Sequence, residues 1–152
     1  MSFNVVIDSN DALTSSASIY DKDYAFDWSV LEEGEYDLTF SFLTSPIAQG
    51  TSDVKAVSLE GLGTQRTTYK AGANTNAQTS QIIGLLNRVN YNDGTARQRF
   101  QQSDTNPVVC LKSRPNSNIF KVRIVANSTT TANAGLSGSY LLILTFIKRE
   151  YK

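Results

Sequence analysis

A strict alternation of apolar and polar side chains over residues 36–42 restricts the possible fold of this chain more than any other feature. The apolar members are Tyr36, Leu38, Phe40 and Phe42, and the residues between them are acidic or small and polar. Successive side chains of a β-strand point to opposite faces, so this pattern predicts a strand with one aromatic face in a core and the other face in water. A helix would spread the same residues around its whole circumference.

Other segments carry related patterns. Residues 3–7 and 120–124 also alternate, whereas residues 140–147 are apolar on both faces. A strand that is apolar on both faces is typical of a central position, so we expect residues 140–147 to lie with one face on the core and the other against a loop or a neighbouring subunit. Residues 81–89 fit a helix or a strand, because Gly84 interrupts their helical spacing.

Turn-forming residues separate these segments at short intervals, for example Gly34, Pro46, Gly94, Pro107 and Pro115. Many short strands joined by such turns are typical of β-sandwiches. We therefore predict an all-β fold, a single jelly-roll β-sandwich of about eight antiparallel strands. The prediction treats residues 1–152 as one domain.

The charges are divided along the chain although the formal net charge is zero. Residues 1–54 hold ten acids against one lysine, and residues 55–152 hold thirteen bases against four acids. Such a division is typical of molecules that dock head to tail through opposite charges. It is also expected if acidic and basic strands lie side by side in one sandwich and neutralise each other locally. The sequence leaves both interpretations open.

The side chains that most catalytic sites use are scarce. The chain has no histidine and one cysteine, Cys110, which removes histidine-based nucleophile pairs and zinc sites of the Cys/His type. Glu32, Glu33 and Glu35 remain as acid–base candidates, but the first two fall in a turn with Gly34, where carboxylates are solvated and keep ordinary pKa values. We predict no catalytic activity, no metal site and no cofactor.

Membrane and nucleic-acid partners are not expected either. The chain begins without a basic segment followed by an apolar stretch, so no secretory signal is predicted. Its longest apolar run, residues 140–147, is far shorter than the roughly 20 residues of a membrane helix. Four arginines have Tyr91 and Phe100 between them in the sequence, but no basic run or known nucleic-acid motif accompanies them: Arg88, Arg97, Arg99 and Arg114.

The single tryptophan, Trp28, allows two interpretations. An exposed indole could stack against a sugar, whereas a buried one would fill the core. Phe26 and Trp28 alternate around Asp27, and the chain then leads into the turn before Tyr36. This context favours a core position for Trp28, beside Tyr36.

Four segments, in this order along the chain, resemble a known family. They are an extended arm, turn and aromatic strand over residues 26–40, Asn106-Pro107-Val108-Val109, Asn118-Ile119-Phe120-Lys121-Val122, and a closing strand over residues 140–146. This arrangement resembles single jelly-roll minor capsid and penton-type proteins of large double-stranded DNA viruses and virophages. The resemblance implies a non-enzymatic virion protein that stabilises an icosahedral shell through contacts with other capsid proteins. It also implies a homo-oligomer, a trimer or a pentamer.

Six charged residues are the candidates for such contacts: Glu32, Glu33, Glu35, Arg97, Arg99 and Arg114. The acidic face of residues 32–37 would be available to a basic neighbour. An alternative function is a receptor- or carbohydrate-binding head of a viral or phage fibre, with residues 70–80 and 126–139 forming the binding end.

Overall fold

Short antiparallel strands make up almost all of the regular structure. The computed structural model describes residues 2–13, 21–48, 55–64, 69–71, 76–78, 81–92, 94, 96–126 and 139–151. Its strands are β1 (Ser2–Asp8), β2 (Asp21–Ala25), β3 (Tyr36–Thr44), β4 (Ile47–Ala48), β5 (Lys55–Glu60), β6 (Tyr69–Ala71), β7 (Asn76–Gln78), β8 (Ile82–Asn92), β9 (Ala96–Gln102), β10 (Val109–Leu111), β11 (Ile119–Ala126) and β12 (Tyr140–Lys148). Two single turns of 3-10 helix, η1 (Ser9–Asp11) and η2 (Trp28–Val30), follow β1 and β2.

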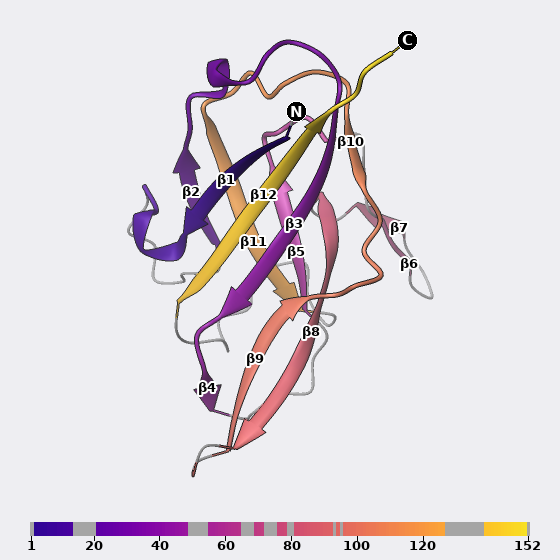
Figure 1. Ribbon diagram of the computed structural model, residues 1–152. Helices are drawn as coiled ribbons and strands as arrows, with labels where there is room; N and C mark the ends of the chain where they lie inside the picture. Colours follow the sequence, from indigo (N-terminus) through magenta and orange to yellow (C-terminus); the bar gives the residue numbers. More distant parts are fainter. Residues whose placement is uncertain are drawn as a thin grey trace.

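The strand pairing is that of a jelly roll. When the short strands β4, β6, β7 and β10 are set aside, the first strand pairs with the last, the second with the second-last, and so on inward: β1 with β12, β2 with β11, β3 with β9, and β5 with β8. This nested pairing arises when one long antiparallel ribbon is rolled up. The strand order β1-β12-β3-β9-β8-β5-β11-β2 confirms the predicted all-β jelly-roll fold (Figure 1).

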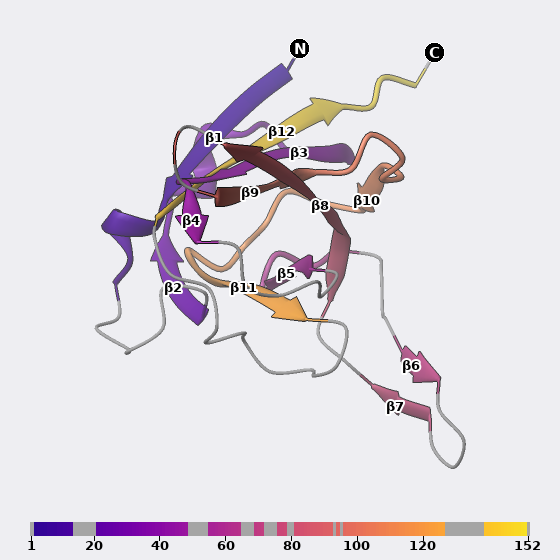
Figure 2. The same ribbon diagram turned by 90° about the horizontal axis from the view of Figure 1, so that it is seen from below.

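The rolled ribbon has two layers that enclose the core. In Figure 2, β1, β12, β3 and β9 form one layer, here called the upper layer, and β5, β11 and β2 lie below it. Strand β8 joins them, because residues 82–86 pair with β5 and residues 86–92 pair with β9. The ambiguous segment 81–89 is therefore a strand, and its register shifts opposite Val57 and Ser58.

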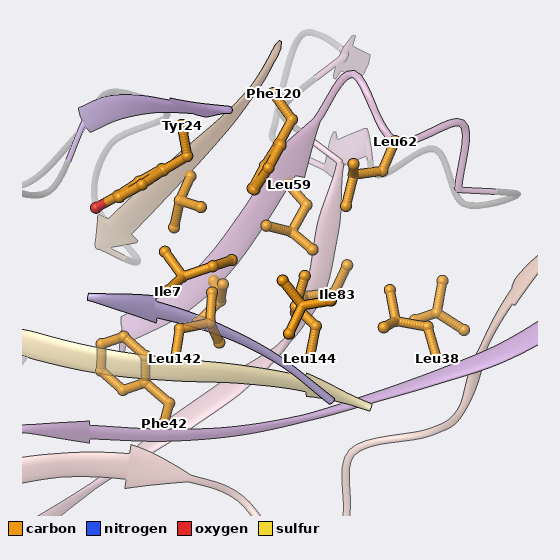
Figure 3. Close-up of a cluster of buried hydrophobic side chains, with 14 of the residues drawn as sticks. Ile7, Tyr24, Leu38, Phe42, Leu59, Leu62, Ile83, Phe120, Leu142 and Leu144 are labelled. Carbon is orange, nitrogen blue, oxygen red and sulfur yellow. The ribbon is translucent and has the colours of Figure 1, made fainter. Parts of the chain in front are cut away.

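Side chains from both layers meet between the sheets, as Figure 3 shows for Phe42, Leu142 and Leu144 from the upper layer and Leu59 and Phe120 from the lower layer, which this view draws at the top. Phe42, Leu142 and Leu144 are the inward members of alternating strands, whereas Leu59 belongs to β5, in which five successive residues are buried. Phe40 departs from the predicted pattern of residues 36–42, since it is half-buried and packs only partly against the core.

Trp28 lies inside the core at one end of the sandwich. It is 1% exposed, and its ring centroid lies 5.6 Å from that of Phe120 and 5.4 Å from that of Phe146. Phe120 belongs to β11 and Phe146 to β12, so the indole connects the two layers. Tyr36 also contacts Phe146, at 6.2 Å between centroids. The core interpretation of Trp28 is confirmed, and this residue is not available as a sugar platform.

A pair of tyrosines connects the two layers nearer the other end of the sandwich. The hydroxyls of Tyr24 on β2 and Tyr140 on β12 lie 2.7 Å apart in a hydrogen bond, and the Tyr140 ring stacks on Phe42 at 5.3 Å. Burial raises the pKa of the Tyr24 hydroxyl above its ordinary value of 10.0. The Tyr24 hydroxyl therefore stays protonated at neutral pH, and the two buried hydroxyls satisfy each other.

Strand β12 is central, between β1 and β3, as predicted, but its outer face is only partly covered. Its inward residues Tyr140, Leu142, Leu144 and Phe146 are buried, whereas Leu141 on the outer face is 41% exposed. Cover by a loop, one of the two expected possibilities, is thus incomplete in this chain. Cover by a neighbouring subunit stays a prediction.

Truncation of Trp28 should destabilise the fold strongly. Replacing a buried tryptophan with alanine removes contacts with both layers and leaves a cavity, which costs about 3–5 kcal/mol. Val30 is more than half exposed in the same 3-10 turn, so Val30→Ala should change the free energy of unfolding by less than about 0.5 kcal/mol. Urea denaturation followed by far-ultraviolet circular dichroism measures both. Equal effects of the two substitutions would contradict the core role of Trp28.

A side chain at Gly84 should also be costly. A Cβ atom built there would lie 2.5 Å from Cε1 of Phe40 and 2.7 Å from Cγ of Asn106. Asn106 cannot easily move, because its amide donates to the Leu85 carbonyl at 2.9 Å and accepts from the Leu85 N–H at 2.8 Å. Gly84→Ala should lower the free energy of unfolding by about 1–3 kcal/mol.

The double variant Gly84→Ala/Phe40→Leu provides the control for this clash. Removing the ring relieves one of the two close contacts, so the double variant should lose less stability than the sum of the two single variants. Strict additivity in denaturant titrations would show that Phe40 is not the obstacle.

Candidate interaction surface

The outer face of the upper layer carries a group of aliphatic side chains, here called the apolar face: Val6, Leu43, Leu141, Ile143 and Ile147. They come from β1, β3 and β12, and Val6, Leu43 and Leu141 are 60%, 45% and 41% exposed. Each lies at the outward position of a strand whose inward neighbours fill the core. Their exposure therefore follows from the alternation of the strands, and these side chains contribute nothing to the packing of the core.

The strand register arranges these residues in rows. Val6 lies opposite Ile143, and Leu141 lies between Asp8 on one side and Leu43 on the other. Leu43 is in turn opposite Gln101 of β9. One row across four strands therefore reads Asp8, Leu141, Leu43, Gln101, with apolar residues in the middle and polar residues at both ends.

A shallow groove of about 620 Å³ lies over this part of the face. Leu43, Leu141 and Ile143 line it from the two central strands, while Asp8 and Arg99 line it from the flanking strands. The combination of an aliphatic centre and polar margins is typical of protein contact surfaces, which have an apolar middle and a polar rim.

The outer face of the lower layer differs. Arg123 on β11 lies 3.7 Å from the Asp21 carboxylate of β2 and 3.4 Å from the Glu60 carboxylate of β5. Lys121 lies 3.8 Å from Asp21. These pairs link three strands through charges that stay in contact with water. The two outer faces of the sandwich are thus chemically distinct, one aliphatic and one ionic.

A second charged group, here called the charged end, surrounds the exit of β12. It consists of four acids, Glu32, Glu33, Glu35 and Asp37, and four bases, Lys112, Arg114, Lys148 and Arg149. The ion pairs are Glu32 with Lys148 at 2.7 Å, Glu33 with Arg114 at 3.5 Å, Glu35 with Lys112 at 3.8 Å and Asp37 with Arg149 at 2.7 Å. Tyr151 also donates a hydrogen bond to Glu35.

These contacts shift several ionisation equilibria. The hydrogen bond from Lys148 lowers the pKa of Glu32 below its ordinary value of 4.5, and the same bond raises the pKa of Lys148. The hydrogen bond to Asp37 raises the pKa of Arg149. The expectation that Glu32 keeps an ordinary pKa was wrong, because a lysine from the far end of the chain lies beside it.

Four of the six charged interface candidates lie together and two lie elsewhere. Glu32, Glu33, Glu35 and Arg114 belong to the charged end, where Arg114 also donates to the Leu31 carbonyl at 2.7 Å. Arg97 and Arg99 lie on β9, and Arg99 lines the groove. A role for any of the six in contacts with a neighbour stays a prediction.

The divided charge is neutralised within the chain at these places. Acids of the first 54 residues pair with bases of the last 98 both at the charged end and on the lower layer. The second interpretation of the charge pattern, local neutralisation by interleaved strands, therefore describes the observed pairs. The head-to-tail interpretation gains no support from these residues.

The apolar face was not among the residues singled out from the sequence. Its signal was nevertheless present, because residues 140–147 are apolar on both faces and one face is enough for a core. The proposed binding segments 70–80 and 126–139 lie mostly outside the described residues.

Within the described ranges, no three His, Cys, Asp or Glu side chains gather in a way that could hold a metal ion. The helical segments among those same ranges are too short and too polar to cross a bilayer.

Comparison with protein-family models, with curated proteins and with solved structures finds no match to this chain. The resemblance to minor capsid proteins therefore rests on the sequence segments alone.

The Glu32–Lys148 pair predicts a pH effect with a defined sign. A carboxylate whose pKa is lowered by folding adds stability above its ordinary pKa of 4.5, and this stability is lost as the pH falls through the lowered value. Lys148→Met should return the pKa of Glu32 toward 4.5, as measured by carboxyl-carbon NMR titration. Its thermal midpoint should lie below that of the wild type at pH 7, and the difference should shrink in acid.

Lys112→Met is the matched control, since Lys112 pairs with Glu35 in the same charged end. It should leave the titration of Glu32 unchanged. A Glu32 pKa that stays low in Lys148→Met would contradict the assignment of the shift to Lys148.

Proposed function

We propose that this protein is a non-enzymatic structural component of a virion, a minor capsid, cement or penton protein that acts through protein–protein contacts. The observation that carries the proposal is the apolar face. Aliphatic side chains from three strands stand outward on a sheet whose core is already complete. Val6, Ile143, Leu141 and Leu43 are neighbours on this sheet, whereas Ile147 is separated from them by Thr145. Contiguous exposed apolar patches on soluble proteins mark contact surfaces.

The jelly roll suits such a role. Its layers are held by long-range pairs such as β1 with β12 and β2 with β11, so the outer face of a sheet is a stiff surface. A stiff surface loses little conformational entropy when it binds a neighbour. The fold alone does not assign function, since jelly rolls also occur in lectins and cupins. The resemblance of the four sequence segments to minor capsid proteins favours the shell among these possibilities.

The chemistry of the face favours a protein partner over a sugar. Sugars are held by exposed aromatic rings together with polar groups, whereas the apolar face is aliphatic and Trp28 is buried. Aliphatic side chains gain free energy mainly when they are covered by other apolar groups. The surface is therefore suited to packing.

Purified particles of the virus that encodes this chain provide the test. Quantitative mass spectrometry should find the chain at a fixed copy number relative to the main shell protein. It should be retained after washing in high salt, because apolar contacts are strengthened rather than screened by salt. Absence from the particles, or a copy number that varies between preparations, would contradict the proposal. Binding of the purified protein to defined glycans on an array would instead support a receptor-binding head.

A further inference from the structure

We infer that the partner of the apolar face is a second copy of this chain, packed face to face about a twofold axis that runs parallel to β12 and β3. The inference rests on the proposed function in one respect, namely that the apolar face is a contact surface. It adds the identity of the partner and the geometry of the contact, and it replaces the trimer or pentamer that the resemblance implies with a dimer.

The order of the strands makes the face suited to a twofold axis. Four strands form it in the order β1, β12, β3, β9. An axis lying in the contact plane, between β12 and β3 and parallel to them, places β12 over β3 of the partner and β1 over β9 of the partner. Leu141 and Leu43 are opposite each other in one row, so Leu141 comes to lie over Leu43 of the partner subunit. Four leucines then meet around the axis, two from each copy.

The ends of the same row are complementary under this operation. The row ends with Asp8 on β1 and with Gln101 on β9. Arg99 precedes Gln101 by two residues in β9 and therefore lies on the same face. The axis therefore brings the Asp8 carboxylate toward the Gln101 amide and the Arg99 guanidinium of the partner subunit. A twofold axis through the same row but perpendicular to the strands would place Asp8 over its own copy. Opposite charges across a contact favour the parallel axis.

The size of the face also suits a dimer. Three strands, β1, β12 and β3, lie side by side about 4.8 Å apart, and over seven residues rising about 3.3 Å each they give a footprint of roughly 330 Å², to which β9 adds the part beside Leu43. The accessible surface exceeds this footprint because the side chains stand out from the sheet. A specific contact buries about 800 Å² of accessible surface on each partner. Sheets pack face to face at a separation of about 10 Å, which leaves room for one leucine layer from each copy.

The lower layer of a second copy is a poorer partner for this face. It would bring Arg123, Asp21 and Glu60 against leucines and remove these ions from water. Desolvation of ion pairs without new partners is unfavourable. Contact between two apolar faces centred on Leu141 and Leu43 places leucines against leucines, and the Asp37–Arg149 ion pair lies away from that centre, opposite Ile147 and six residues along β12.

The first test is the mass of the protein in solution, measured by size exclusion with light scattering over a concentration series. The wild type should form a dimer. Leu141→Lys should raise the dissociation constant of the dimer at least tenfold, because it places a cation in the leucine layer. Ile119→Lys is the matched control, because Ile119 is an exposed aliphatic residue at the start of β11, on the other layer. It should leave the dimer unchanged. The fluorescence of buried Trp28 and circular dichroism report whether each variant is folded.

A pair of substitutions at Gln101 tests the axis. Gln101 is exposed, and it faces Asp8 of the partner subunit only if the axis is parallel to the strands. Gln101→Lys should tighten the dimer and Gln101→Glu should weaken it, each by about two- to fivefold, the range of an exposed ion pair. Both effects should diminish in high salt. Shifts in the same direction for both variants would overturn the proposed axis.

The remaining outcomes are decisive as well. A wild type that stays monomeric, a trimer or pentamer, or a dimer that Leu141→Lys leaves intact would each overturn the inference. The proposed function fails separately. A monomer found at fixed copy number in particles would support the structural role and contradict the dimer. A dimer that is absent from particles would support the dimer and contradict the structural role.

Discussion

The nine-residue pairing between β3 and β12 is the constraint on which the rest of the structure depends. It joins Tyr36 to Lys148 at one end and Thr44 to Tyr140 at the other, and so connects the first third of the chain with its last residues. β1 pairs with the free side of β12, and β9 and β10 pair with the free side of β3. Trp28 packs on Phe146 of the same strand, which attaches the lower layer to the upper one. A shift of this register by one residue would turn every core side chain of β12 outward.

The same pairing explains the charged end. Once Lys148 lies beside Tyr36, the residues after β12 must pass the turn before β3, and the Arg149 N–H donates to the Glu35 carbonyl at 2.9 Å. The acids of that turn then meet the bases that follow the strand. Each of these exposed ion pairs contributes little to the free energy of unfolding. They lie where β12 leaves the sheet, so they oppose fraying at this end of the pairing between β3 and β12.

The sequence was informative wherever one face of a segment was clearly apolar. The alternation of residues 36–42 predicted β3, and the continuous run at residues 140–147 predicted a central β12. Residues 81–89 could not be assigned, because helix and strand patterns coincide in so short a run and only pairing with β5 and β9 decides between them. The partners of Glu32 and Arg114 were equally out of reach. Both contacts join residues more than 80 positions apart, and a pattern within one segment carries no information on which distant segment lies beside it.

The two outer faces show what the fold itself requires and what it leaves open. Inward positions of β12 must be apolar, but outward positions need only be compatible with a strand, and the lower layer fills its outward positions with Asp21, Lys121 and Arg123. Threonine at position 145 shows that a polar residue is also tolerated outward on β12, where it donates a hydrogen bond to Asn4. Leu141 and Ile143 stand at positions where a polar side chain would serve the strand equally well. Their free energy of burial is gained only when something covers them, so the apolar face is better explained by a contact outside the chain than by the stability of the sandwich.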